Sequence, residues 1–311
     1  MEPKAVKLSL GYKVSWGVAA LGTSLISGIY GAMLPIFYQD YLGLSARWIG
    51  IAATVYAIWN AINDPLFGFI TDNTRSKLGR RIPYMRFTAP FLALTFMPVW
   101  LTPLEAGELS QFIWMLVTML LYDTAYTIIG LVYSALLPEV SESDAERNGL
   151  QISSSLFAML GMILGFLIPD FVRPQSGDTS LLPFRLAMVG VGIVGMALIL
   201  FTTFKVKERK EFTVVDQPLT LIESVKYTFT SKSFLVLVSA NFMSILTSSL
   251  VTGSMFYLAD YVMQRPTILL LVALFVPILI MIPMTSLLRS KLGVLRSQQL
   301  LLVIAGIGLL A

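Results

Sequence analysis

Asp64 is a carboxylate inside a long apolar stretch, and the residues around it are rich in oxygen atoms. Pro65 follows it directly and cannot donate a backbone hydrogen bond, so the carbonyl one turn earlier is left free. Asn60 and Asn63 add two amide oxygens, and Asn60 shares a helix face with Asp64. Oxygen ligands of this kind suit a hard cation. These residues predict a cation-binding site; a capping or arginine-paired structural role for Asp64 is the alternative.

Asp123 is a second acid within an apolar stretch. Asp123, Thr127 and Gly130 are spaced i, i+4 and i+7, so they lie on one face of a helix. We interpret Asp123 as a substrate-binding residue and Thr127 as part of the cation site. A paired structural acid that lines the cavity is the alternative for Asp123. Three aromatic residues in the same stretches can stack on a sugar ring or an apolar ligand: Trp59, Tyr126 and Tyr133.

The stretches that carry these acids belong to a membrane protein. Apolar residues make up 56% of the 311 residues and charged residues 13%, whereas soluble domains carry about 25% charged residues. A spanning helix needs roughly 20 apolar residues, and such stretches recur along the chain. The hydropathy predicts an all-α protein with spans at about 14–38, 46–71, 84–103, 109–137, 150–171, 182–204, 233–261 and 266–288, and a ninth from about 297.

The loops between these stretches predict the orientation. With the N-terminus inside, four basic residues fall outside, and the other 18 of the 22 lie inside. This bias predicts a multi-pass protein of the cell membrane with a cytoplasmic N-terminus and a cytoplasmic segment at 205–232. That segment is either a solvated linker or a short amphipathic helix on the membrane surface. The outside residues are Arg47, Arg173, Arg185 and Arg265.

The chain contains neither cysteine nor histidine. Their absence excludes disulfides, thiolate chemistry, imidazole catalysis and any His/Cys metal site. The formal charge of +4 follows from the basic loops, so we expect no nucleic-acid partner. The expected partners are the lipid bilayer and a small-molecule substrate, with no cofactor beyond a coupling cation, H⁺ or Na⁺. A membrane enzyme or sensor is a remote alternative.

The pentapeptide RSKLG occurs twice, at 75–79 and, 214 positions later, at 289–293. Both copies follow a predicted span on the same side of the membrane, although both can also be simple basic turns ended by glycine. The repeat indicates two parallel six-helix halves with the substrate site between them. We expect an N-terminal bundle at 1–204, an inter-half loop at 205–232 and a partial C-terminal bundle at 233–311. About three helices of the second half are then absent, as in a fragment or a truncated product.

Two segments carry a family resemblance. The run WNAINDPLFG at 59–68, with the loop after it, and YSALLPE at 133–139 resemble the glycoside-pentoside-hexuronide:cation symporters of the major facilitator superfamily. The resemblance implies the major facilitator fold, a cation-site role for Asp64 and a cytoplasmic gate around the loop. With the second copy of the repeat, the expected gating residues are Asp72, Arg75, Gly79, Arg80, Arg81, Arg289 and Gly293.

Three positions depart from the family pattern. Asn60 stands where the family usually has an acid, Gly130 where it has an acid on helix 4, and Ser155 where it has a sugar-binding arginine. The resemblance implies cation-coupled symport of a glycoside or related organic solute by alternating access. An amphiphilic, lipid-like solute in the same fold is the alternative, because the neutral positions suit such a cargo.

Overall fold

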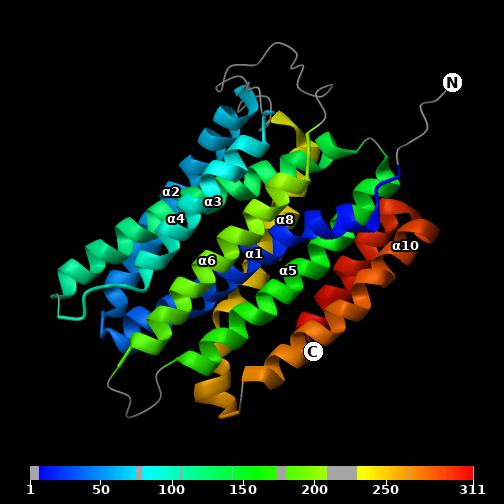
Figure 1. Cartoon of the computed structure of the whole chain (residues 1–311). Helices are drawn as coiled ribbons and strands as arrows, with labels where there is room; N and C mark the ends of the chain where they lie inside the picture. The colour runs from blue at the N-terminus through cyan, green and yellow to red at the C-terminus, as the bar shows by residue number, and fades with distance from the viewer. Residues whose placement is uncertain are drawn as a thin grey trace.

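The computed structural model describes residues 7–74, 79–105, 107–141, 143–173, 180–208, 230–265 and 267–310. These ranges form helices and contain no strand (Figure 1), which confirms the predicted all-α class. The first part holds α1 (Leu10–Ile36), the short π-helical segment η1 (Phe37–Tyr41), α2 (Ala46–Asn73), α3 (Ile82–Val99), α4 (Glu108–Val140), α5 (Asp144–Val172) and α6 (Leu182–Lys205). The second holds α8 (Lys232–Gly253), α9 (Met255–Tyr257), η3 (Leu258–Met263) and α10 (Thr267–Leu310).

Several helices begin where the sequence supplies a start signal. The Ser9 hydroxyl accepts the backbone N–H of Tyr12 at 3.2 Å and so caps α1. Pro83 and Pro183 lie in the first turns of α3 and α6, where a missing N–H costs no helical hydrogen bond. The α5 helix starts at Asp144, six residues before the predicted span. Acidic side chains in the first turn of a helix stabilise it, because they interact favourably with the positive end of the helix dipole.

In the first part, α1 lies at the centre. It packs against α5 and α6, whereas α2 packs against α4, and α3 packs against α4 and α6. Glycines allow the closest approaches: a Cβ added at Gly161 of α5 would reach the α1 backbone, and one added at Gly22 would reach the backbone of α6. Small residues of this kind are typical of helix contacts within membranes. In the resulting bundle α2 packs directly against α4, and α3 lies with them (Figure 1).

Five helices in the described ranges are long and apolar enough to cross a membrane. They are α1 with η1, α4, α5, α6 and most of α8, and many large apolar side chains on the helices are exposed, as a lipid-facing surface requires. The predicted spans at 46–71 and 84–103 correspond to α2 and α3. The α2 helix carries Asp64 and Asp72, and α3 has 18 residues. Both pack on α4 within the bundle.

Connections at one end of the bundle are basic, and we call it the basic end. The α1 helix begins there, α2 and α4 end there, and α6 leads out of it into 206–208. The residues 209–229 and Arg75 lie outside the described residues, and with them the predicted amphipathic helix. At the opposite end, Arg173 after α5 contacts both carboxylate oxygens of Asp260 in η3, at 2.5 and 3.0 Å. This contact raises the pKa of the Arg173 guanidinium and ties α5 to the second part of the chain.

The two copies of RSKLG end in glycines with the same unusual backbone. Gly79 has a φ of 108° and Gly293 a φ of 77°, a region that residues with a side chain rarely adopt. Gly293 breaks α10, so that the predicted spans 266–288 and from 297 lie on its two sides. Figure 1 shows the chain turning back within α10. The shared conformation supports equivalent turns, while the division into 1–204, 205–232 and 233–311 stays a prediction.

Candidate cation and substrate site

The predicted cation and substrate residues meet where α2 packs on α4. Asn60 donates from its side-chain amide to Asp123 Oδ1 at 3.2 Å, and Asn63 donates to Asp123 Oδ2 at 3.0 Å. One turn further along both helices, the Thr127 hydroxyl donates to Asp64 Oδ1 at 3.1 Å. Both helices run toward the basic end, so a step of four residues on each leads from the first group of contacts to the next. The structure therefore brings all five side chains to one helix interface.

The two carboxylates at this interface have different surroundings. Asp123 is 2% exposed and accepts both asparagine amides, whereas Asp64 is exposed and accepts one hydroxyl. Asn60 and Asn63, which the sequence places beside Asp64, turn their amide donors to the other acid. The residues thus form two adjoining sites: the Asp64 site, with Thr127, and the Asp123 site, with Asn60 and Asn63.

The three predicted aromatic residues lie in different environments. Trp59 is 37% exposed, and its indole donates to the Thr124 hydroxyl at 3.1 Å. The Tyr133 hydroxyl contacts the Trp16 carbonyl at 2.9 Å and the Ser154 hydroxyl at 2.8 Å, and its ring stacks on Trp16. Tyr133 is therefore committed to joining α4 with α1 and α5. Trp59 is open to a ligand, and Tyr126, half-buried, stacks on the next tyrosine of α4.

Further tyrosines surround the Asp123 site, and one of them, Tyr122, was not among the predicted site residues. Its ring stacks on Tyr30 of α1 with centroids 4.0 Å apart. The hydroxyls of both rings are buried, and neither has a hydrogen-bond partner among the described residues. Tyr56 of α2 lies close enough for its hydroxyl to interact with the Asp123 carboxylate. The sequence could have pointed to Tyr122 only because it directly precedes Asp123, an acid within a predicted span.

The predicted gating residues cluster at the basic end. Arg81 is 5% exposed and pairs with Asp72 of α2 at 2.5 Å and with Glu139 of α4 at 3.3 Å. Arg80 pairs with the same Glu139 oxygen at 2.5 Å. The cluster joins the end of α2, the start of α3 and the end of α4. Two expected gating residues lie elsewhere, on α10: Arg289, which is exposed, and Gly293.

Glu208, which follows α6, completes this cluster, and we did not expect it from the sequence. Its carboxylate accepts the backbone N–H groups of Arg80, Arg81 and Ile82 at the start of α3. A carboxylate is favoured there because a helix N-terminus carries unpaired donors and the positive end of the dipole. A Cβ on Gly79 would collide with this carboxylate. The sequence could have pointed to Glu208 only through its position, as an acid just beyond the predicted span at 182–204.

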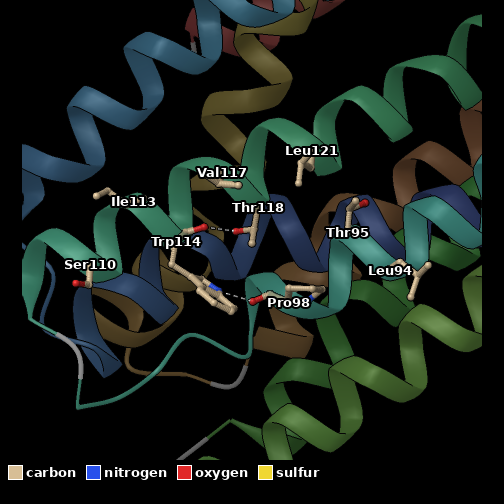
Figure 2. A pocket seen from close by; sticks show the side chains of 9 residues that line it. All are labelled: Leu94, Thr95, Pro98, Ser110, Ile113, Trp114, Val117, Thr118 and Leu121. Carbon is tan, nitrogen blue, oxygen red and sulfur yellow. Dashed lines mark hydrogen bonds between the residues drawn. The ribbon is translucent and has the colours of Figure 1, made fainter.

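A separate groove of about 470 Å³ lies between α3 and α4 and is lined by neither of the two acids (Figure 2). Six of its nine lining residues are apolar and the other three are serine or threonine. The indole of Trp114 donates to the Pro98 carbonyl at 2.8 Å. The groove contains no ionisable side chain among its lining residues. It therefore offers no group for cation coupling and is not the site that the sequence predicts.

Comparisons with known proteins identify the family of this chain. The sequence profile described as MFS/sugar transport protein matches residues 15–311. The uncharacterized symporter YnaJ of Bacillus subtilis is 29% identical over 98% of this chain and 67% of its own length. The putative glycoside/cation symporter YagG of Escherichia coli is 26% identical over 84% of this chain and 56% of its own length. The sodium-dependent lysophosphatidylcholine symporter 1 of Xenopus tropicalis is 29% identical over 52% of this chain and 31% of its own length.

These matches concern transporters rather than enzymes, and they confirm the predicted resemblance. The matched part of the chain covers about two thirds of the length of YnaJ, 56% of the length of YagG and 31% of the length of the Xenopus symporter. With an all-α fold and an intramembrane acid pair between α2 and α4, the chain belongs to the MFS/sugar transport family of the major facilitator superfamily.

Proposed function

We propose that the full-length protein is a secondary transporter in the cell membrane that couples uptake of a small organic solute to a cation bound at Asp64. The observation that carries this proposal is an exposed carboxylate in the second half of α2, more than two turns from its end, with the Thr127 hydroxyl on one of its oxygens. Charge at such a depth is costly and marks an ion or substrate path. The names of two relatives, which call them symporters, support the same interpretation.

In this mechanism Na⁺ binds at the Asp64 site. Asp64 is exposed, so its carboxylate oxygens are open to a cation, and the Thr127 hydroxyl beside it supplies a further oxygen. The carbonyl freed by Pro65 is a third candidate ligand. Proton binding at Asp64 is the competing form of the proposal. One relative is named as sodium-dependent, which favours Na⁺.

The substrate binds beside this cation between the two halves, and the basic end faces the cytoplasm. Alternating access then opens the site to one side at a time. A glycoside is the first candidate, with Trp59 as a stacking surface. An amphiphilic solute is the second, because the α4 position usually acidic in the family is Gly130. Among the described residues, nothing lies within 4 Å of where a Gly130 Cβ would be, so this wall is neutral and open.

Thermal unfolding of the purified full-length protein tests this proposal. We expect Na⁺ with the correct solute to raise the unfolding temperature, since a ligand at 100 times its Kd adds about 2.7 kcal/mol of stability. The panel comprises glycosides, pentosides, hexuronides and lysolipids, each with and without Na⁺. Asp64→Asn should abolish the Na⁺-dependent part of the shift, because it removes the charge that binds the cation.

Asp40→Asn is the matched control for this panel. Asp40 is also exposed but lies in η1, far along the chain from the acid pair, so its loss should leave the Na⁺ shift intact. Equal shifts in wild type and Asp64→Asn would refute cation binding at Asp64. A shift with lysolipids alone would select the amphiphile.

A further inference from the structure

An ion pair joins the two parts of the chain at the end opposite the basic end, which we call the outer end. Arg173, which follows α5, lies 2.5 Å from one carboxylate oxygen of Asp260 in η3 and 3.0 Å from the other. Two such bonds between a guanidinium and a carboxylate are stronger than neutral hydrogen bonds and fix the geometry. Because α5 also packs on α10 (Figure 1), this bridge holds a helix of the first part against the second part.

The basic end has no equivalent bridge between the two parts among the described residues. The ion pairs of Lys13, Arg80 and Arg81 connect helices of the first part only. The basic side chains that the second part contributes to this end are exposed and form no ion pair with a described residue: Lys232, Arg289, Lys291 and Arg296. Among the described residues, the ionic link between the parts therefore lies at the outer end.

The segment that carries Asp260 has a counterpart in the first part. The sequence reads FYQDY at 37–41 and FYLADY at 256–261. The first run forms η1 at the end of α1, and the second leads into η3 after α8. Just beyond each π-helical turn lies a residue with positive φ, Gly43 at 72° and Gln264 at 50°. Turns of this kind are rare and frequently occur at functional sites. Both parts therefore carry the same unusual turn at the outer end.

We propose that Arg173 and Asp260 are gating residues of the outer end, and that the bridge between them keeps the Asp64 site closed on that side. This inference rests on the proposed function, because a gate has a meaning only in a transporter. In alternating access, the two parts separate at one end while they stay together at the other. A bridge at the outer end thus belongs to the state that opens at the basic end, and it must break before the outer end opens.

The exposure of this bridge suits a contact that breaks in every transport cycle. The Arg173 side chain is 20% exposed and the Asp260 side chain 36%. Charges that keep part of their contact with water gain little when they pair, so such a bridge shifts an equilibrium only a few-fold. A fully buried pair would resist opening much more strongly. The bridge between Arg173 and Asp260 can therefore favour one state without preventing the other.

Labelling of a single cysteine in the full-length protein tests this gate. The 311 residues contain no cysteine, and any cysteine elsewhere in the full-length protein is first replaced by serine. Gly130→Cys then places one thiol beside the Asp64 site, where an added Cβ meets no described atom within 4 Å. A membrane-impermeant maleimide is added to cells and to inverted vesicles, which expose the two sides separately. We expect faster labelling from the basic-end side.

Arg173→Ala should raise the labelling rate from the outer side by about twofold to fivefold, the size of effect that a partly exposed ion pair has on an equilibrium. Asp260→Asn removes the same bridge with little change in shape, so it decides the question if Arg173→Ala fails to fold. The two changes together should have no more effect than either alone, because each already removes the bridge.

Arg185→Ala is the matched control for these variants. Arg185 also lies at the outer end, at the start of α6, but its guanidinium donates to the Thr102 carbonyl within the first part at 2.5 Å. Its loss should therefore leave the outer-side labelling rate unchanged.

The labelling requires neither Na⁺ nor a solute, so its result is separate from the test of the cation site. Equal outer-side rates in Arg173→Ala and Arg185→Ala would overturn the gate, as would additive effects of Arg173→Ala and Asp260→Asn. Wild type that labels equally fast from both sides would also contradict it. Faster outer-side labelling in both gate variants of a protein that does not respond to Na⁺ would support the gate and refute only the cation at Asp64.

Discussion

Arg81→Ala is expected to destabilise the full-length protein by about 3 kcal/mol and to abolish uptake. The guanidinium is 5% exposed and joins α2, through Asp72 and Thr71, to Glu139 of α4. Removing one partner of a buried ion pair costs about 3–5 kcal/mol when the other charge stays buried. This applies to Glu139, whose side chain is 10% exposed, and not to Asp72, whose side chain is 60% exposed. The lower figure applies since Arg80 still pairs with Glu139. Uptake should stop because the basic end can no longer lock in one of its two states.

Chemical unfolding in detergent and uptake into vesicles measure the two effects of Arg81→Ala. Arg47→Ala is the control, because Arg47 is exposed at the start of α2 and its loss should change stability by less than about 0.5 kcal/mol. Arg81→Ala combined with Glu139→Gln should cost less than the sum of the single changes, since the residues contact each other. An Arg81→Ala protein as stable and active as Arg47→Ala would show that the cluster has no gating role.

Sequence reasoning located the helices and the two acids well, for a plain physical reason. Apolar stretches must be long enough to cross the bilayer, and an ionisable group within one is conspicuous because it is costly. Asp64 and Asp123 were therefore singled out without any coordinates, and they do lie at one helix interface. The repeat was also informative, since Gly79 and Gly293 both have positive φ.

The partners of each side chain could not be predicted in the same way. Whether Asn63 turns to Asp64 on its own helix or to Asp123 depends on how far α2 is shifted along α4, and hydropathy contains no information on that shift. The start of α5 at Asp144 was missed because its first turn is polar and stands outside the apolar window. Glu208 was missed because its partners are backbone N–H groups, which no side-chain pattern marks.

Gly161→Ala is expected to destabilise the protein by about 2–3 kcal/mol, although alanine is normally the better helix former. An added Cβ would lie 2.9 Å from the Leu25 nitrogen and 3.1 Å from the Ser24 Cβ, and closer still to the Leu21 carbonyl. Two of these atoms belong to the α1 backbone, and the third is the first side-chain atom of a residue on α1. None of them can rotate away, so α1 itself must move. The extra methyl group then costs packing that no side-chain rotation can restore.

The control for Gly161→Ala is the same substitution at Gly190, which is exposed on α6. In the described part of the chain, nothing lies within 4 Å of a Cβ there, so Gly190→Ala should stabilise by about 0.5–1 kcal/mol through helix propensity. Opposite signs of the two changes in unfolding free energy are the expected result, and equal signs would contradict close packing of α1 on α5. The test also bears on function, because α1 holds Tyr30 against Tyr122 beside the Asp123 site. A displaced α1 should therefore weaken ion binding even in the fraction of Gly161→Ala that folds.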